Sequence, residues 1–540
     1  MPRLFEFAQG LLDGTLLVAL AVAVGGIPWA LVVLRARQRA ADDPMVRQAA
    51  RLVVGGALAL AVCQVLELAI KISVLEDLLG TSALTRFAET VQFRAGALRA
   101  VLGAALAGAG LWVVRRPNAG TRWAVAAVLA AMLLVAGAWL VHGAARLEDR
   151  ESLMALTALH QAAAAVWVGG LVQLAALTRL RRRDPRVDAA WPEVVGRFGR
   201  VALASLALLL VAGLPLAVRY VGSWNGLVGT GYGSLLGAKI ALTLVVLGFG
   251  GFNYLAGRRA ARGHPETVRE RTPAFVQAET ILLVALVFIA TALSSQPPAI
   301  DTPGDQATLA EVVETFRPKW PTLTTPSLAD KRKHESDPLA VVGGERTATE
   351  YSWSNFSHNV AGLFLLPMSL VALAAHGARS RWARHWPLGF VGLAVFVFLR
   401  SAASEGSWPF GDVPLFEDDA EGFQHRIGAV LALALGLLEW RARTAERPGP
   451  SAYVFPVLAA AGGILLLIHA HAAFEVKSNY LIQVTHVAMG ALAVLLACGR
   501  WLELRLPPPG ARAAGTAAST AMLLIALVLL FYREANIVID

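Results

Sequence analysis

The stretch LLDGTLLVALAVAVGGIPWALVVLRARQR, residues 11–39, joins a long apolar run to a cluster of arginines. A helix needs about 20 such residues to cross a hydrocarbon core about 30 Å thick. Backbone groups cannot remain unpaired in lipid, so a crossing run of this kind must be helical. Because similar runs recur along the whole chain, we predict an all-α fold, a polytopic transmembrane helical bundle.

The composition also indicates a membrane protein. Of the 540 residues, 56% are apolar and 16% are charged, whereas soluble domains carry about 25% charged residues. The net charge is +10, but the arginines lie in short loops, which is typical of cytoplasmic retention and not of a nucleic-acid-binding surface. Cys63 and Cys498 lie far apart in apolar segments, so neither a disulfide framework nor a cysteine metal site is expected. The N-terminus, MPRLFEFAQG, lacks a cleavage pattern, and we expect no removable signal peptide.

Fourteen helices are predicted from the apolar runs, connected by thirteen loops. They span residues 11–35, 52–78, 93–114, 123–143, 153–178, 200–219, 234–257, 275–296, 356–377, 386–402, 425–441, 452–471, 479–498 and 516–532.

Basic residues concentrate in the odd-numbered loops. Examples are RARQR (35–39), RLRRRDPR (179–186) and RRAARGHPETVRER (258–271), whereas the even loop at 404–424 has six carboxylates and no basic residue. Under the positive-inside rule, the odd loops face the cytoplasm and both termini face the outer side. This pattern predicts a multi-pass protein of the bacterial inner membrane, with periplasmic termini.

A polar segment divides the chain. Residues 297–355 are rich in Pro, Thr and charged residues, and they have nine acidic and six basic side chains. We interpret this segment as an external connector between an eight-helix half, residues 1–296, and a six-helix half, residues 356–540.

Seven of the eleven histidines fall in the predicted outer half of the bilayer, on six helices; these are His142, His160, His358, His425, His469, His471 and His486. One interfacial histidine alone is most simply a satisfied polar residue. Five at one depth on a single half favour a convergent site, because polar groups at membrane depth usually face the bundle interior. Neutral imidazole binds copper, zinc, nickel and iron, so we predict a metal site. In the C-terminal half, His469 or His471 together with His486 are the first candidates.

Sulfur and carboxylate groups accompany these histidines. Met489 follows His486 by three residues and therefore lies on the same helical face. A thioether beside imidazoles would favour Cu(I), although packing is the commoner role of a single methionine. The acidic loop 404–424 would concentrate cations at the entrance, or it is an ordinary external loop.

Four other polar residues lie within predicted helices. Glu67 and Lys71 are spaced i,i+4, which favours an internal ion pair over a transport role. We expect Lys239 to pair with a carboxylate or a backbone carbonyl. Glu279, with Asn253, lies near the inner ends of two helices, and the pair either forms a polar exit for an ion or stabilises helix packing.

Several spaced motifs resemble one family. HQAAAAVWVGGLVQL (160–174) is similar to the His-x(6)-Trp-x-Gly-Gly-Leu motif of the bacterial copper-resistance protein D (CopD/PcoD) family. RFGRVALASLALLLVAGLPLAVRYVGS (197–223), YGSLLGAKIALTLVVLGFGGFNYL (232–255) and FVQAETILLVALVFIATALSSQPP (275–298) resemble the family in the same order. The resemblance covers about 120–300, and the C-terminal half looks like the extension of longer, fused members.

The resemblance implies copper transfer across the inner membrane, often beside a small periplasmic copper-binding protein. It makes His142 and His160 candidate ligands of a copper ion, Cu+ or Cu2+, and Lys239 matches the family motif.

We therefore predict a copper-binding membrane protein that accepts copper from the periplasmic side and transports or transfers it. The chain has no nucleotide-binding, phosphorylation or nucleophile motif, so we expect neither an ATP-driven pump nor an enzyme. Two alternatives stay open: a haem b-binding electron carrier using histidine pairs, and a metal-free scaffold or partner-binding module.

Overall fold

The computed structural model describes most of the chain. The described residues are 2–35, 43–80, 83–115, 120–140, 146, 149–260, 262–264, 266–327, 329–330, 348–377, 381–413, 420–446, 449–468 and 477–534. Three predicted ligands, His142, His469 and His471, lie outside these ranges.

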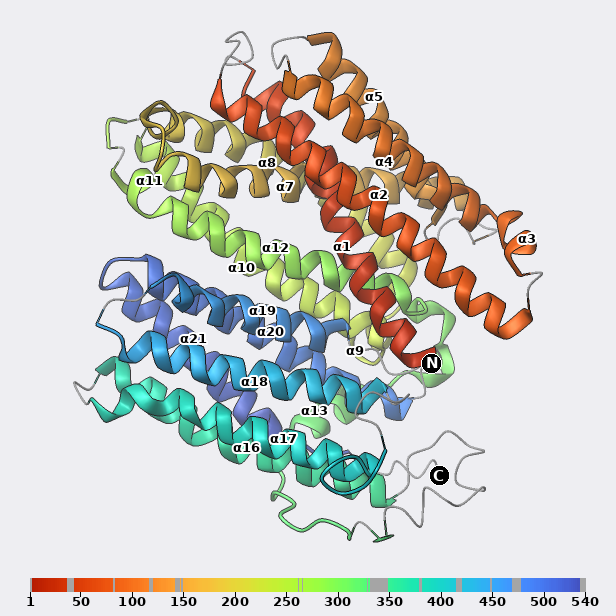
Figure 1. Cartoon of the computed structure of the whole chain (residues 1–540), viewed down its shortest axis with the longest axis vertical. Helices are drawn as coiled ribbons and strands as arrows, with labels where there is room; N and C mark the ends of the chain where they lie inside the picture. The colour runs from red at the N-terminus through yellow and green to blue at the C-terminus, as the bar shows by residue number, and fades with distance from the viewer. Residues whose placement is uncertain are drawn as a thin grey trace.

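The described residues form a bundle of long helices (Figure 1). Thirteen of the described helices are long and apolar enough to cross a membrane, which confirms the predicted fold class. The long helices are α1 (Pro2–Pro28), α2 (Pro44–Leu79), α4 (Val91–Arg115), α5 (Gly120–Gly137), α7 (Arg150–Leu180), α8 (Pro185–Val221), α10 (Gly231–Ala260), α12 (Thr272–Ser295), α16 (Ala348–Gly377), α17 (Gly389–Glu405), α18 (Ala420–Thr444), α19 (Val454–Ile468), α20 (Lys477–Arg505) and α21 (Gly510–Leu530).

The helix expected at 425–441 is present as α18 but is not among those thirteen candidate spans. Its ends carry Arg426, Glu439 and Arg443, which lower its hydropathy. Both Arg426 and Glu439 are buried. The charged residues of this helix therefore need partners within the protein, and they make the helix too polar to count among the candidate spans.

Local capping makes some helices longer than the apolar runs predict. Asp43 accepts hydrogen bonds from the backbone N–H of Met45 at 2.9 Å, and Pro44 occupies the first turn of α2. Asp184 and Pro185 begin α8 in the same way. A carboxylate cap followed by proline is a strong helix start. Consequently, part of the arginine-rich segment before residue 200 is helical.

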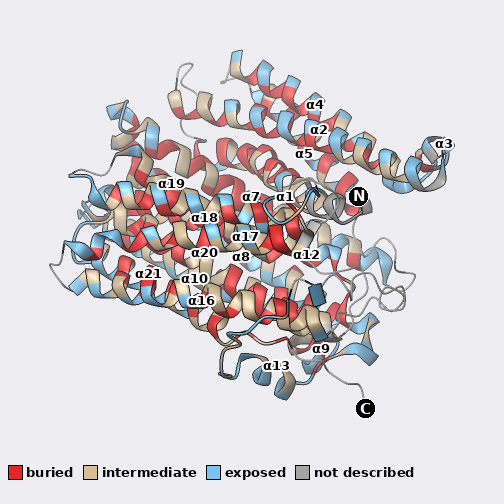
Figure 2. Ribbon diagram, turned by 60° about the horizontal axis from the view of Figure 1, so that its bottom comes forward, coloured by how far each residue is buried: buried red, intermediate tan, exposed pale blue. Residues whose placement is uncertain are grey.

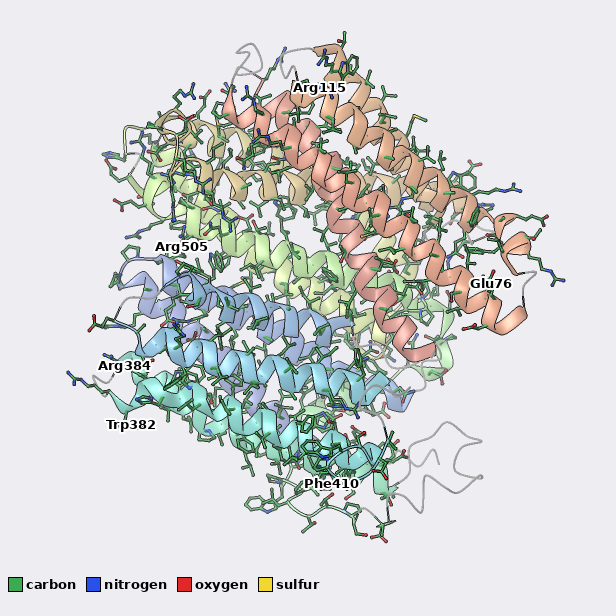
Figure 3. All side chains as sticks on the ribbon, viewed as in Figure 1. Glu76, Arg115, Trp382, Arg384, Phe410 and Arg505 are labelled. Carbon is green, nitrogen blue, oxygen red and sulfur yellow. The ribbon has the colours of Figure 1, made fainter. Side chains whose placement is uncertain are left out.

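The two ends of the bundle differ in charge. Figure 3 shows Arg384 and Arg505 at one end, with Glu76 and Phe410 at the opposite end. We call the first the arginine end. The second is called the α9 end, because the short helices α3 (Ala83–Ala88), α9 (Trp224–Val228) and α13 (Leu309–Phe316) lie there (Figure 1). The arginine end corresponds to the predicted cytoplasmic side.

Buried residues follow the faces where helices meet, and exposed positions recur along the outer sides of α2 and α4 (Figure 2). Many of the exposed side chains are large and apolar, such as Val62 and Val101. An apolar surface of this kind is the expected lipid contact of a membrane helix.

Two glycines bring α1 and α7 into backbone contact. A Cβ atom on Gly25 would lie 2.1 Å from the carbonyl oxygen of Ala165, and one on Gly169 would lie 2.0 Å from the carbonyl oxygen of Ala21. Small residues permit such close approach between membrane helices. Gly169 belongs to the Trp-x-Gly-Gly-Leu motif, so at least one motif position serves helix packing.

The two membrane halves pack through α12 against α19 and α20. The indole N–H of Trp501 donates to Gln277 Oε1 at 3.2 Å, and the Cys498 thiol donates to the carbonyl oxygen of Ala278 at 3.6 Å. One hydrophobic core contains residues from both sides of this contact, including Leu282 and Val494. The position of each half is therefore fixed by the other.

The connector is attached to the C-terminal half at the α9 end. Lys477, the first residue of α20, forms an ion pair with Glu311 of α13 at 2.5 Å. Burial opposes ionisation of Glu311, but hydrogen bonds from Lys477 and Thr308 outweigh it and lower the pKa of this carboxyl. The lowered pKa means that this contact stabilises the fold at neutral pH and is lost as the pH falls through the folded-state value.

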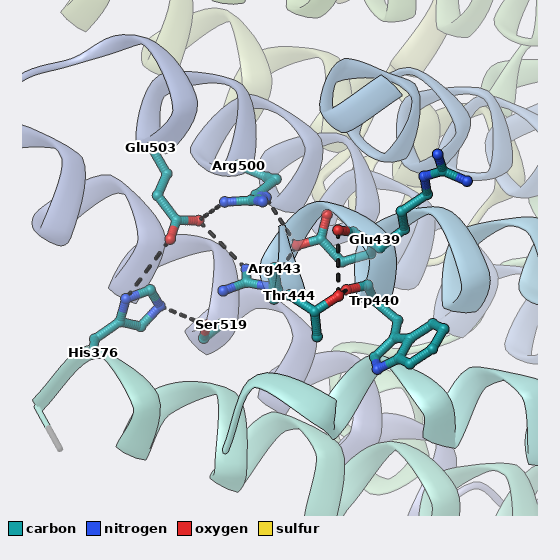
Figure 4. Close-up of polar contacts among 9 residues, drawn as sticks. His376, Glu439, Trp440, Arg443, Thr444, Arg500, Glu503 and Ser519 are labelled. Atoms are coloured by element: carbon teal, nitrogen blue, oxygen red, sulfur yellow. Dashed lines mark hydrogen bonds and ion pairs between the residues drawn. The ribbon is translucent and has the colours of Figure 1, made fainter. Parts of the chain in front are cut away.

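A buried ion network joins four helices of the C-terminal half near the arginine end (Figure 4). Glu439 of α18 is fully buried and pairs with Arg443 at 2.5 Å and with Arg500 of α20 at 3.0 Å. Arg500 also pairs with Glu503 at 2.8 Å, and His376 of α16 lies 3.9 Å from Glu503.

The same network extends to α21, where the Ser519 hydroxyl lies 3.2 Å from His376 Nε2. Two guanidinium groups and two carboxylates balance each other, so their charges are buried as paired groups. This pairing accounts for the position of α18 in the bundle despite its charges.

We expect Glu439→Gln to destabilise the C-terminal half by about 3–5 kcal/mol, because removing one partner leaves buried arginines without their counter-charge. The melting temperature in detergent should fall clearly. Glu314→Gln is the matched control, since Glu314 forms only exposed ion pairs with Arg317 and Lys319, and it should leave the melting temperature unchanged. Equal melting temperatures for the two variants would contradict the proposed role of the network.

Candidate metal centre

Two predicted ligands, His358 and His486, meet in the C-terminal half. They come from α16 and α20, and each lies a similar distance along its helix from the α9 end, where Ala348 and Lys477 begin the two helices. Their ring centroids are 5.6 Å apart, with an angle of 86° between the ring planes. His486 is buried, and His358 is partly buried.

Both imidazoles are held by their own helices. His358 Nδ1 lies 2.9 Å from the carbonyl oxygen of Ser354, and His486 Nδ1 lies 3.0 Å from that of Ile482. A carbonyl oxygen can only accept, so each Nδ1 must carry the proton and each Nε2 has the lone pair. This is the tautomer that a metal-binding histidine needs, with its orientation set by the second nitrogen.

The chain after α21 forms one wall of this site. The ring of Tyr532 stacks on His358 at 4.0 Å and lies 6.0 Å from His486. The buried carboxylate of Glu534 accepts from the Tyr532 hydroxyl at 2.7 Å and from the Ser354 hydroxyl at 2.5 Å. Because Ser354 Oγ also lies 3.3 Å from His358 Nδ1, the carboxylate is connected to the imidazole through Ser354.

Two asparagines of α16 hold this wall in place. Asn355 Oδ1 accepts from the backbone N–H of Glu534 at 2.7 Å, and Asn359 Nδ2 donates to the carbonyl oxygen of Tyr532 at 2.9 Å. Tyr532, Glu534 and Ser354 were absent from the sequence prediction. The sequence shows only that a tyrosine and an acid lie at the end of the last apolar run. Their contact with α16 depends on the tertiary structure.

The remaining predicted residues of the C-terminal half are placed differently. His425 is exposed on α18, whose main packing partners are α17 and α19. Met489 is 3% exposed and lies one turn beyond His486 on α20. Among the described residues, no group of three or more His, Cys, Asp or Glu side chains has the arrangement of a metal site. His358 and His486 are therefore a pair of donors, and His469 and His471 lie in the undescribed segment between α19 and α20.

His160 lies in the other membrane half, on α7 beside α8. A Cβ atom on Gly213 would be 3.0 Å from its Cε1 and 3.1 Å from its Nδ1. Within the described part of the chain, this buried Nδ1 has no hydrogen-bond partner. A buried imidazole nitrogen without a partner is costly in a structural role and is suited to binding a ligand.

Lys239 lies on α10, which packs against α8, the helix of Gly213. We expected its ammonium group to pair with a carboxylate or a carbonyl oxygen. Among the described residues, no ion pair or amine hydrogen bond of Lys239 is seen, so this pairing stays a prediction.

The other buried polar residues have clear partners. Lys71 pairs with Glu67 at 2.5 Å, and Gln64 donates to the same carboxylate at 2.6 Å, which confirms the predicted internal ion pair. Asn253 of α10 donates to Glu279 of α12 at 3.1 Å, so the structure joins these two residues as well.

Comparisons with known proteins point to a copper-related family. Residues 192–293 match the family model described as Copper resistance protein D. Copper transport protein CutJ of Bacillus subtilis (strain 168) is 30% identical over 154 residues, which cover 28% of this chain and 27% of that protein. The matched region thus spans about a quarter of the curated relative.

No solved structure matches the chain. The family match includes α10 with Lys239 and Asn253, most of α8 with Gly213, and α12 with Glu279, whereas His160 precedes it and the His358–His486 pair follows it. The chain is a multi-pass helical membrane protein, and it carries a domain of the copper-resistance protein D family at residues 192–293.

Proposed function

We propose that this protein binds copper at the periplasmic side of the inner membrane through outward-facing histidines and transports or transfers it across the membrane. The observation that supports this most strongly is the His358–His486 pair, two imidazoles at matched depth whose Nδ1 atoms are occupied by backbone carbonyls. The copper-resistance domain in the other half favours copper over the other metals that imidazole binds.

Copper is the substrate in this proposal, so the site must bind it reversibly. Two imidazoles are fewer ligands than a closed structural site uses, which suits a metal that enters and leaves. His469 or His471 is the candidate third ligand, because both belong to the connection that leads from α19 into α20, the helix of His486. Met489 supplies a soft thioether close to the same face and would favour Cu(I).

His160 is the proposed ligand of the N-terminal half. Its partnerless Nδ1 faces the position where Gly213 lacks a side chain. In this scheme copper is delivered by a small periplasmic copper-binding protein, and the acidic segment 404–424 attracts the cation to the entrance.

The C-terminal ligands are tested by copper stoichiometry. In the double variant His358→Ala, His486→Ala we expect loss of the copper bound to the C-terminal half, because the two oriented donors are gone. Metal analysis of the purified full-length protein after copper loading measures this. His385→Ala is the matched control, since His385 lies on a different segment and accepts a hydrogen bond from Trp440 at 2.8 Å; it should retain wild-type copper.

Unchanged copper in the double variant would contradict the assignment of these ligands. Absorption spectra of the same preparations test the alternative of a haem b-binding electron carrier. A Soret band that is present in the wild type and disappears in the double variant would show that this pair binds haem and not copper. Wild-type protein that binds neither would favour the scaffold alternative.

The N-terminal ligand is tested by copper flux. We expect His160→Ala to reduce copper transport into proteoliposomes at least tenfold while copper bound at the C-terminal pair is retained. Gly213→Ala should reduce transport less, because the added methyl group would stand about 3.0 Å from the imidazole and displace it without removing it. Transport at the wild-type rate in His160→Ala would exclude this residue from the path.

A further inference from the structure

A cavity lies between α7, α8, α10 and α12, where the copper-resistance domain meets α7. Its volume is about 680 Å³, and apolar side chains such as Trp167 and Val246 form most of its lining. The charged side chains at its rim include Arg197, Arg200 and Arg258. These arginines lie near the start of α8 and the end of α10, so the cavity opens toward the arginine end.

Two buried polar side chains interrupt this apolar lining. Glu279 is 4% exposed and Asn253 is 8% exposed, and both line the cavity. Asn253 Nδ2 donates to Glu279 Oε2 at 3.1 Å. The other carboxylate oxygen, Glu279 Oε1, faces Gly250, and a Cβ atom built on that glycine would lie 3.6 Å from it. Asn253 Oδ1 is buried and has no hydrogen-bond partner in the described part of the chain.

Glu279 differs from two other acids of this protein that lie within the helical bundle. Glu67 pairs with Lys71 at 2.5 Å, and Glu439 pairs with Arg443 at 2.5 Å and Arg500 at 3.0 Å. Within the described ranges, Glu279 has an amide donor and no ion-pair partner. A carboxyl group at this depth is far less costly to bury protonated than ionised when no cation neutralises it.

The chemistry of the cavity points to a proton and not to a metal ion. Its lining contains no histidine, cysteine or methionine, the side chains that bind copper. Two oxygen donors are too few for Ca2+ or Mg2+, which take six or more oxygen ligands. The arginine rim would also repel a metal cation, whereas one carboxyl oxygen is sufficient to hold a proton.

We propose that Glu279, hydrogen-bonded to Asn253, is a proton-binding site that the cavity connects to the arginine end, and that its protonation is coupled to metal movement past His160 and Lys239. The carboxylate takes one proton from water in the cavity to form an O–H bond and later returns it to water. The coupling has a structural route, because α7 carries both His160 and the cavity residue Trp167, and α10 carries both Lys239 and Asn253. The coupling rests on the proposed copper transport; the proton site itself does not.

The proton site is tested with dicyclohexylcarbodiimide, an apolar reagent that attaches covalently to protonated carboxyl groups in membrane proteins. We expect full-length protein in liposomes to be labelled at Glu279, with labelling that decreases as the pH is raised and disappears in Glu279→Gln. Peptide mass spectrometry locates the label. Glu67, which is half-buried, and Glu439, which is buried, are internal controls, since both are ion-paired on long helices, and they should remain unlabelled.

Absence of label at Glu279 overturns the site, and so does equal labelling of Glu67 and Glu439. The reagent needs no copper, so this result is independent of the proposed function. An Asn253→Asp variant with an unchanged elution profile serves as a second probe. It places a carboxylate beside Glu279, and the pH range over which Glu279 is labelled should shift; an unchanged range contradicts the pairing.

The coupling is tested in proteoliposomes that enclose a pH indicator. Copper flux in the wild type should be accompanied by a change in internal pH and should depend on an imposed pH gradient. Glu279→Gln should abolish the pH change, whereas Glu193→Gln at the exposed rim should not. Copper flux that is independent of pH in the wild type overturns the coupling. Wild-type protein that transports no copper overturns the proposed function, but the labelling result still stands.

Discussion

The structure depends on one constraint: a backbone or side-chain polar group in lipid must find its partner within the protein. Helices satisfy the backbone, and thirteen described helices have the length and apolarity to cross a membrane. Side-chain charges must then be paired across helices or neutralised. The ion network of Glu439, Arg443, Arg500 and Glu503 shows the first solution, and it explains how a helix as polar as α18 can belong to the bundle.

The same constraint applies to the residues for which we propose a function. Polar groups that serve packing are paired, as Glu67 and Lys71 are. His160 Nδ1 and Asn253 Oδ1 are buried without partners in the described part of the chain. Glu279 has an amide beside it and lines a cavity. Other buried side-chain atoms, such as Gln64 Oε1 and Glu439 Oε2, also lack a partner there. The cavity at Glu279 and the Gly213 position beside His160 are what single these groups out for our proposals.

The two halves contribute different parts of one molecule. The C-terminal half holds the oriented imidazole pair, with Tyr532 stacked on it and Glu534 connected to it through Ser354. The N-terminal half contains the family domain and the cavity. Contact through α12, α19 and α20, together with a hydrogen bond from the Tyr480 hydroxyl to the carbonyl oxygen of Val228, links them mechanically. The proposed metal-binding pair in one half and the proposed proton site in the other are thus joined through packed helices.

Much of this architecture could be read from the residues alone. Apolar length predicts helices because lipid imposes it, and i,i+4 spacing predicts the Glu67–Lys71 pair because one helix supplies both partners. The depth of His358 and His486 follows from counting residues along each helix. What could not be predicted involves contacts between helices: the approach of His358 to His486, the wall formed by Tyr532 and Glu534, and the cavity at Glu279. Sequence determines which residues share a helix and at what level they lie, whereas tertiary packing decides which faces of different helices meet.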